Sequence, residues 1–355
     1  LDGLEAWLVT RLGKSIVRAR DTPNFVANRV GVFSILAVLH HTQRLGLAFD
    51  EVDLLTGPRI GRPKSATFRT ADVVGLDTLV HVLGTMQATL PDDPWRAHFR
   101  MPEWLQALIA KGALGQKTKA GIYRKQGRQI QVLDLHLQDY RDSGGEVFPD
   151  VEDILKLRNP AEKFAQLAAH PHPQAQFLWA IFRDVFHYCA HQLASIADNA
   201  RDVDLAIRWG FGWKMGPFET WQAAGWEQVA KWIAEDIAAG KTMSSAPLPA
   251  WVTDGRKGVR EAQLADGRWI QISERRTAEG GRRNRKAIVP RMVNDRSGSR
   301  WAALPRRRAR GSCPAAHRSR ASTVARPASA RAIARRMGAI AVMSIAATTL
   351  PVGSA

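Results

Sequence analysis

The sequence predicts a mainly α-helical protein, in which two tandem helical repeats follow a short helix–strand stub and precede a basic tail without regular structure. Three observations predict this. Apolar residues recur every three or four positions through most of the first 250 residues, which is the period of an amphipathic helix. A motif from the first half returns in the second half. After residue 250 the composition changes and the apolar periodicity ends.

The stub occupies the first residues of the chain. Residues 4–12 have the pattern of an amphipathic helix, and Gly13 is a suitable residue to end it. Residues 15–19 have the character of a short strand, and the turn-forming residues 21–24 follow. A helix, a strand and a turn in this order are what we expect from the last part of an α/β domain, at the edge of its sheet.

The repeat is visible in two short motifs. The first copy reads Val-Asp-Leu-Leu from Val52 and Gly-Arg-Pro from Gly61. The second copy reads Val-Asp-Leu-Ala from Val203 and Gly-Trp-Lys-Met-Gly-Pro-Phe from Gly212. Each copy follows a long amphipathic segment. Two such units should pack on each other, because neither buries its apolar face alone.

Shorter helices and strands are predicted around the first repeat motif. Residues 50–55 should form a short helix with Asp50 as its N-cap. Residues 70–86 have the pattern of one continuous helix, and residues 122–124 and 129–132 have the character of short strands.

The net charge of +18 is concentrated in the tail. Residues 253–355 contain 21 Arg and 2 Lys but only 6 acidic residues, so the preceding part is nearly neutral. From Arg296 onward there are 12 Arg and neither Lys nor acidic residues, which a GC-rich gene gives when it is translated out of frame. A frameshifted tail, a disordered basic tail and, least favoured, a folded module are the open readings. Nucleic-acid binding through this tail is a weaker hypothesis, because the body is nearly neutral.

Cysteine and histidine usage argues against a metal site. Two cysteines, Cys189 and Cys313, cannot build a zinc site or a disulfide framework, and a reducing cytoplasmic setting is expected. His187 and His191 are four residues apart, but no Glu stands beside them as in zinc peptidases. No apolar run reaches the ~20 residues that a membrane span needs.

Three motifs together resemble one family. Residues 14–30 look like the junction at which a last Rossmann strand runs through an Asp-Thr-Pro-Gly-Phe turn into a helix with Asn-Arg. Residues 115–123 look like a Gly-Arg-Lys-Thr-Gly-x-Gly-Phe-Tyr signature, and residues 216–219 read Gly-Pro-Phe-Glu. On these motifs, residues 1–250 resemble 3-hydroxyacyl-CoA dehydrogenases, and most closely the long bacterial enzymes with a doubled helical domain.

The departures from the family pattern are small. Asn24 stands where the family turn has Gly, and Asn is the next-best residue for a positive φ. Residues 64–68 replace a Met-Gly-Pro-Phe type of run, and Ala120 replaces a common Gly. None of these changes removes a chemical group that the reaction needs.

The resemblance implies a division of the chain. Residues 1–22 would be the remnant of an NAD-binding Rossmann domain, residues 23–125 the first helical repeat and residues 126–159 a connector. Residues 160–250 would be the second helical repeat, and residues 251–355 the Arg- and Ala-rich tail.

The implied activity is the NAD-dependent oxidation of a 3-hydroxyacyl-CoA to a 3-ketoacyl-CoA in fatty-acid β-oxidation, by a dimer that uses the helical domain. Neither the Gly-x-Gly-x-x-Gly turn for the dinucleotide nor the His-Phe-Phe-Asn-Pro motif occurs in the chain. We therefore expect a fragment that is inactive alone, with the NAD fold and the histidine base upstream. The alternative is a non-catalytic helical module for dimerisation or binding.

Two residues are candidates for the site by the same resemblance. Asn28 would be catalytic, because its amide can donate a hydrogen bond to a developing oxyanion without titrating. Lys117 would contact the ribose or nicotinamide side of NAD. The alternatives are a local backbone bond for Asn28 and a solvated loop charge for Lys117. His40 and Glu219 are expected to be structural.

Overall fold

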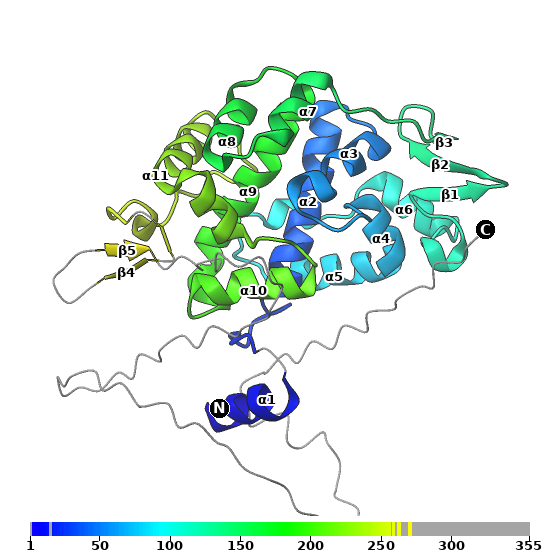
Figure 1. The fold of residues 1–355 in the computed structure, drawn as a ribbon. Helices are drawn as coiled ribbons and strands as arrows, with labels where there is room; N and C mark the ends of the chain where they lie inside the picture. Colours follow the sequence, from blue (N-terminus) through cyan, green and yellow to red (C-terminus); the bar gives the residue numbers. More distant parts are fainter. Residues whose placement is uncertain (1, 14–15, 257, 260, 264–268, 272–355) are drawn as a thin grey trace, which may run out of the picture. The chain divides into compact units, whose positions relative to one another are not determined.

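The computed structural model describes residues 2–13, 16–256, 258–259, 261–263 and 269–271. These residues lie within one compact unit and form eleven α-helices, four short 3₁₀ helices and two small sheets (Figure 1). The prediction of a mainly α-helical protein is confirmed. Within this described part, no helix is both long enough and apolar enough to cross a membrane.

The first half contains nine helical elements and the first sheet. The helices are α1 (Asp2–Leu12), α2 (Ala27–Leu45), α3 (Phe49–Leu55), η1 (Pro58–Ile60), α4 (Phe68–Val74), α5 (Leu76–Thr89), η2 (Arg96–His98), α6 (Glu103–Ala110) and η3 (Gln116–Thr118). The sheet is antiparallel, in the order β1 (Tyr123–Gln126), β2 (Gln129–Asp134) and β3 (Asp139–Asp142).

The second half is helical up to its last described segment. Its elements are α7 (Pro149–Lys156), α8 (Pro160–Ala169), α9 (Pro173–Ile196), α10 (Ala200–Gly210), α11 (Pro217–Ala238), η4 (Ala250–Val252) and the antiparallel pair β4 (Glu261–Gln263) and β5 (Trp269–Gln271).

The two long helices α2 and α9 pack side by side at the centre of the core (Figure 1). Phe33 of α2 stacks on Tyr188 of α9 with ring centroids 3.8 Å apart, and the Trp95 ring meets both rings edge-on. Gly31 faces Phe211, and a Cβ on Gly31 would lie 2.0 Å from the tip of that ring. The repeats therefore share one apolar core, and only glycine fits at this contact.

The Val-Asp-Leu motifs have the same role in both repeats. The carboxylate of Asp53 accepts hydrogen bonds of 3.0 and 2.7 Å from backbone N–H groups 14 and 15 residues further along the chain, at the start of α4. The carboxylate of Asp204 accepts bonds of 2.8 and 3.1 Å from groups 14 and 15 residues further, at the start of α11. These N–H groups have no partner inside their helices, so each motif caps the next helix. The sequence repeat is a structural repeat.

The two equivalent Gly-containing loops also touch each other. The backbone N–H of Lys214 donates to the carbonyl of Gly61 over 2.8 Å, and the Arg62 guanidinium lies 4.0 Å from the ring centroid of Trp213. Both loops use a positive φ, 79° at Gly61 and 66° at Gly212, which glycine adopts without strain.

A buried polar cluster joins the first turn of α2 to α9. The Arg29 guanidinium donates to Asp93 at 3.0 Å, to the Tyr188 hydroxyl at 2.6 Å and to Gln192 at 3.1 Å. All four side chains belong to buried residues. Because a buried charge is tolerated only when it is paired and hydrogen-bonded, this cluster fixes the start of α2 in one position.

The predicted N-cap role of Asp50 is wrong. The helix α3 begins one residue earlier, and the Asp50 carboxylate instead accepts two bonds from Arg141 at 2.8 and 3.0 Å and bonds from the backbone N–H groups of Gly144 and Gly145. Burial opposes ionisation of this carboxyl, but the bonds from Arg141 and Gly144 outweigh it and lower its pKa to about 2. Asp50 therefore fastens β3 and the following loop to α3.

Three other elements differ from the sequence pattern. The helix predicted over residues 70–86 is broken at Gly75, which has a φ of 101°. The strand predicted over residues 15–19 appears, in its described residues, only as a single bridge between Ala19 and Ala197. Gly225, with a φ of 98°, puts a kink inside α11.

The packed part of the chain extends past residue 251, the predicted start of the tail. The Trp251 ring lies 5.9 Å from Trp226, whose indole N–H donates to the carbonyl of Val252 over 3.0 Å. Within the predicted tail, the strands β4 and β5 also pair with each other. The frameshifted and disordered readings concern mainly residues 272–355, which lie outside the described residues.

The Arg29 cluster gives a prediction for stability. Replacing Arg29 with Met leaves the Asp93 carboxylate buried without its cation, so we expect the free energy of unfolding to fall by about 3 kcal/mol. The matched control is Arg59→Met, because Arg59 pairs with Glu152 at a half-exposed site and its loss should cost about 0.5 kcal/mol. Urea denaturation followed by circular dichroism measures both. Equal losses in the two variants would contradict the assigned role.

The Asp50 contacts give a prediction for pH dependence. Since the folded pKa lies below the ordinary value of 3.8, the charged carboxylate stabilises the fold above about pH 4, and this stability is lost as the pH falls towards 2. Asp50→Asn should therefore melt at a lower temperature than wild type at pH 7, and the difference should shrink between pH 4 and pH 2. Asp153→Asn, at an exposed position, should follow wild type throughout; a pH-independent difference for Asp50→Asn would refute the linkage.

Candidate functional site

Asn28 lies in the first turn of α2, and its side chain is exposed. Its amide forms no hydrogen bond with the described residues, so the local backbone bond considered above is not what the structure shows. The turn before it has the expected geometry, since Asn24 adopts a φ of 63°. Arg29, the next residue, is buried in its cluster. The amide is thus presented outward on a fixed backbone.

Lys117 lies on η3 and is paired. Its ammonium group is 2.6 Å from both carboxylate oxygens of Asp77, near the start of α5. The two side chains are 49% and 43% exposed, so the pair is at the surface. The hydrogen bond from Lys117 lowers the pKa of Asp77. Lys117 is therefore a positioned charge, rather than a freely solvated one.

The loop around Lys117 is fixed to α4 by Asp72. The Asp72 carboxylate accepts bonds of 2.9 and 2.8 Å from the backbone N–H groups of Ile122 and Tyr123. Burial raises the pKa of Asp72 to about 6, although these two bonds act in the opposite direction. A Cβ on Gly115 would lie 2.3 Å from the Asp72 carbonyl, and one on Gly121 would lie 2.1 Å from its carboxylate. The glycines of the signature are needed for this close approach.

Asn28 and Lys117 come from separate elements, and no hydrogen bond or ion pair joins them. The position equivalent to Asn28 in the second repeat, at the same distance ahead of the Val-Asp-Leu motif, is Trp179. Trp179 is buried, and its indole N–H donates to Asp236 over 2.9 Å. Among the described residues, only the first repeat therefore carries an exposed amide at this position of its long helix. An amide does not titrate, so this arrangement can donate hydrogen bonds but cannot remove a proton.

Of the four histidines of α2 and α9, His41 and His187 are buried, whereas His40 and His191 are half-buried. His41 lies 2.6 Å from Asp184, and neither side chain is exposed. The His40 ring contacts the rings of His41 and His98 at centroid distances of 4.8 and 4.9 Å. Burial is the main reason why the pKa of His40 is lowered to about 4, and it also lowers the pKa of His41.

The other candidate groups also have structural contacts. The His187 imidazole is 2.8 Å from the carbonyl of Ala246, and burial raises the pKa of the Cys189 thiol well above its usual range. Glu219 accepts bonds from the Gly216 backbone N–H at 2.8 Å and from Arg208 at 2.9 Å. Across the described part of the chain, no group of three His, Cys, Asp or Glu could hold a metal ion.

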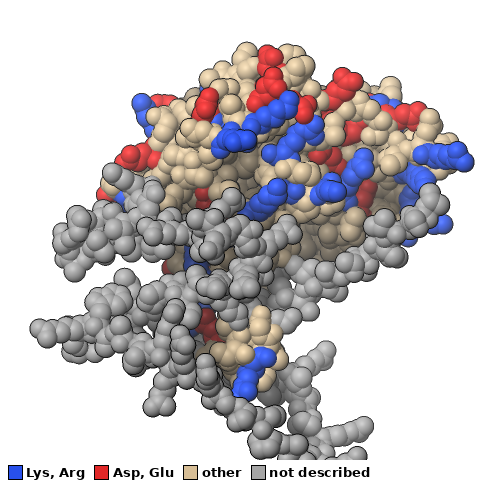
Figure 2. Space-filling view, viewed as in Figure 1, with Lys and Arg blue, Asp and Glu red and all other residues tan. Residues whose placement is uncertain are grey.

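The surface charges of the described residues are mixed. Figure 2 shows basic and acidic side chains interspersed over the visible face. This agrees with the sequence count, in which almost all of the net charge of +18 lies in residues 253–355. The face in view offers no single-sign surface of the kind that attracts nucleic acid.

The residues that support the site carry no recognisable signal in the sequence. The Asn-Arg pair is part of a family motif, but no neighbouring residue indicates that Arg29 is buried. Its partners Asp93, Tyr188 and Gln192 are distant in the sequence. Asp77, the partner of Lys117, also has no sequence signal apart from its place after Gly75 at a helix start.

The comparisons with known proteins concern the same segments. Residues 25–125 match the family model described as 3-hydroxyacyl-CoA dehydrogenase, C-terminal domain. A probable 3-hydroxyacyl-CoA dehydrogenase of Bacillus subtilis is 37% identical over 243 residues, which are 68% of this chain and 30% of that protein. A protein of the same name from Deinococcus radiodurans is 46% identical over 114 residues, 32% of each chain.

Two more distant matches follow. A Rickettsia felis protein named for a trifunctional enzyme of a fatty acid oxidation complex is 27% identical over 65% of this chain and 32% of its own length. The crystal structure of 3-hydroxybutyryl-CoA dehydrogenase from Escherichia coli aligns over 71% of this chain and 63% of that chain, with 16% identity and a TM-score of 0.48. This chain spans about a third of the length of the curated relatives that it matches. Residues 25–125 thus form a C-terminal domain of the 3-hydroxyacyl-CoA dehydrogenase family.

Proposed function

We propose that this chain is the helical C-terminal part of an NAD-dependent 3-hydroxyacyl-CoA dehydrogenase of fatty-acid β-oxidation, whose NAD fold and histidine base lie upstream of these 355 residues. The observation that supports this best is the Asn28 amide. It is exposed and without a partner among the described residues, while the next residue, Arg29, is buried in a cluster that fixes the helix start. Such an arrangement suits a hydrogen-bond donor that faces a ligand.

Among the described residues we assign only one contact to a dinucleotide, that of Lys117 with the ribose or the carboxamide. Lys117 offers an ammonium group at the surface, held by Asp77 within a loop that Asp72 fixes. This charge suits the hydroxyl and carbonyl oxygens of a ribose or a carboxamide. The described part of the chain does not contain the Gly-rich turn that holds a pyrophosphate, so that contact must come from elsewhere. When bound, NAD would accept the hydride from C3 of the substrate.

In this proposal Asn28 orients the substrate and does not transfer a proton. Its amide would donate a hydrogen bond to the oxygen on C3, which gains ketone character as the alcohol is oxidised. The proton of that hydroxyl requires a base that titrates near neutral pH. His41 is buried against Asp184, and burial lowers the pKa of His40 to about 4, so neither is assigned this role. The base is therefore assigned to the upstream half.

The partners and location follow from the same proposal. The substrate would be an acyl-CoA, the assembly a homodimer through the helical domain, and the compartment the cytoplasm. Light scattering of the protein extended with its upstream sequence tests the assembly, and a monomer over the micromolar range would refute the dimer.

The first functional prediction concerns Asn28. We expect NADH-dependent reduction of a 3-ketoacyl-CoA only in a protein extended with the in-frame upstream sequence, and not in these 355 residues alone. In the extended protein, Asn28→Ala should lower kcat by about 10²-fold, since one preorganised donor to the reacting oxygen is lost. Gln166→Ala, which removes an exposed amide from α8, should leave kcat unchanged.

Each result of this experiment is informative. Activity of the 355-residue chain alone would refute the assignment of the base and the NAD fold to the upstream half. Absence of activity in both proteins would favour the non-catalytic module. Equal activity of Asn28→Ala and wild type would remove Asn28 from the site.

The second functional prediction concerns Lys117. In the extended protein, Lys117→Met should raise the KM for NADH by about tenfold with a small change in kcat, because a charged hydrogen bond to the cofactor is lost. Lys117→Arg should restore part of the affinity. Lys125→Met, at an exposed position of β1, serves as the control. A KM unaffected by Lys117→Met would show that this ammonium only pairs with Asp77.

A further inference from the structure

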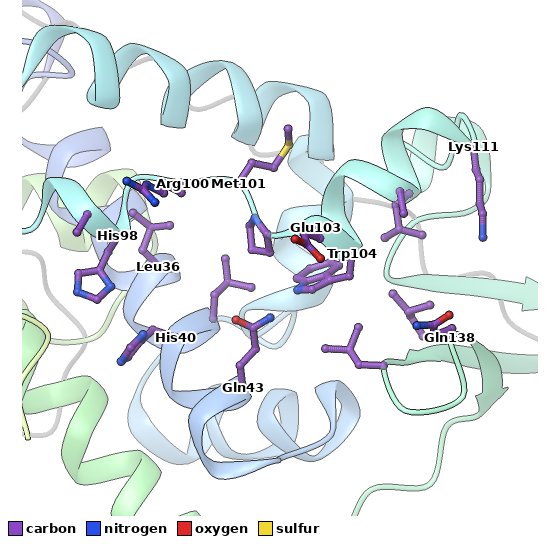
Figure 3. A pocket seen from close by; sticks show the side chains of 17 residues that line it. Leu36, His40, Gln43, His98, Arg100, Met101, Glu103, Trp104, Lys111 and Gln138 are labelled. Carbon is purple, nitrogen blue, oxygen red and sulfur yellow. The ribbon is translucent and has the colours of Figure 1, made fainter.

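A cavity of about 750 Å³, the larger cavity, lies between the second half of α2, the segment around η2, the helix α6 and the β2–β3 hairpin (Figure 3). Figure 3 shows Arg100, Glu103 and Lys111 around it, and all three residues are exposed. Water solvates an exposed charge, so these three side chains need no bound counter-ion.

A smaller cavity of about 30 Å³, the Arg62 cavity, lies where the two repeats meet. The residues that line it include Ser34, Arg62, Thr67, Thr70, Phe211 and Trp213, and none of its lining residues is acidic. This volume holds one or two particles of the size of water. It is far below the roughly 300 Å³ of the smallest usual sites for organic ligands, so only water or a small ion fits.

Arg62 brings a buried positive charge to this cavity. The residue is only 7% exposed, and its Nε and Nη2 atoms are buried without a hydrogen-bond partner. Burial lowers the pKa of the guanidinium to about 9, so the group is still charged at pH 7. Among the described residues, no acidic side chain forms an ion pair with it. A buried charge without a partner costs free energy, so a counter-charge is needed here.

The aromatic rings beside Arg62 do not replace a hydrogen-bond acceptor. The guanidinium carbon lies 4.0 Å from the ring centroid of Trp213 and 6.0 Å from that of Phe182. Ring faces attract a cation, but the N–H bonds lie in the guanidinium plane and still require acceptors. Trp213 stands at the position of the second repeat that is equivalent to Arg62. The unpaired donors therefore lie at the contact between the repeats.

Two lysines add further positive charge near this cavity. Lys64 follows Arg62 by two residues, and the backbone N–H of Lys214 donates to the carbonyl of Gly61 over 2.8 Å. Both lysines are exposed, and neither forms an ion pair with the described residues. Clustered positive charges raise the local concentration of anions. The lining residue Pro63 is only half-buried, so an ion can reach the cavity from the solvent.

We propose that the Arg62 cavity binds a small inorganic anion of the size of chloride, held by the free N–H groups of the guanidinium. The hydroxyl groups of Ser34, Thr67 and Thr70 already donate to protein oxygens at 2.7, 2.9 and 2.6 Å. The donors left for a guest are therefore those of Arg62, and the guest must accept. Water would accept but would not balance the charge. This inference rests on the lining of the cavity and does not depend on the proposed dehydrogenase reaction.

The test is thermal melting of the 355-residue chain in sodium chloride, sodium bromide and sodium gluconate, each at an ionic strength of about 0.15 M. Gluconate is too large for the cavity. We expect the chain to melt about 3 °C higher in chloride and in bromide than in gluconate, because an anion that binds only the folded state stabilises it by mass action. Neither NADH nor an acyl-CoA is present, so failure here is distinguishable from failure of the proposed function.

The variant Arg62→Met tests the placement of the anion. It removes the charge with little change in volume, so the difference between chloride and gluconate should vanish. In gluconate it should melt at or above the wild-type temperature, since an apolar side chain replaces a buried charge without a partner. The matched control is Arg59→Met, at a half-exposed site three residues earlier, which should keep the full difference. The basic tail is the same in every variant, so the comparison cancels its attraction for anions.

A second variant keeps Arg62 and fills the cavity instead. Thr70 is a half-buried lining residue of α4, and Thr70→Leu places a larger apolar side chain there. It should therefore also lose the difference between chloride and gluconate. The line width of the chloride NMR signal measures exchange with the bound ion, and wild type should broaden this signal more than either Thr70→Leu or Arg62→Met.

Three outcomes would overturn the proposal. The first is an equal melting temperature of wild type in all three salts. The second is a chloride effect that persists in Arg62→Met, since the anion would then bind elsewhere. The third is equal broadening of the chloride signal by wild type and by Thr70→Leu. If Arg62→Met does not fold, the comparison of wild type with Thr70→Leu decides, and circular dichroism verifies that both are folded.

Discussion

The contact between α2 and α9 is the interaction on which the rest of the structure depends. Neither helix could stay in water with its apolar face exposed, and the two helices occupy equivalent places in the two repeats. Their packing brings Phe33 onto Tyr188, and beside it the end of α10 inserts the ring of Phe211 against Gly31 of α2, where only glycine leaves room. Once this contact is made, the loops at Gly61 and Gly212 lie against each other, and η2 is held over the same core.

Polar groups inside this core determine where the functional surface lies. The Arg29 cluster fixes the start of α2, and the His41–Asp184 pair fixes its second half against α9. The first interaction presents Asn28, and the second holds the helix beside the larger cavity. In each contact the buried carboxylate, Asp93 or Asp184, accepts hydrogen bonds from a neighbouring side chain, which offsets the cost of its burial. The helix thus offers two separate surfaces, one at each end.

How much could be predicted from the sequence depends on how local each feature is. The helix class follows from periodicity and the repeat from two short motifs, and both signals need only residues that are close in the sequence. The N-cap of α3 was missed because Asp50 has distant partners in Arg141 and Gly144. The break at Gly75 was missed since apolar spacing continues across it. The candidate site came from motifs, while its supports, Asp77 and Asp93, and both cavities depend on residues that folding alone brings together.

The pair Asn28 and Trp179 shows how duplication within one chain permits specialisation. Two separate subunits of identical sequence would each keep the exposed amide, because every change would appear in both. Here the second copy has an indole that is buried and bonded to Asp236, so this copy serves as internal support for the first. In the described part of the chain, two equivalent helices therefore provide a single exposed amide, and the repeats share their backbone and their capping aspartates but not the side chain at this position.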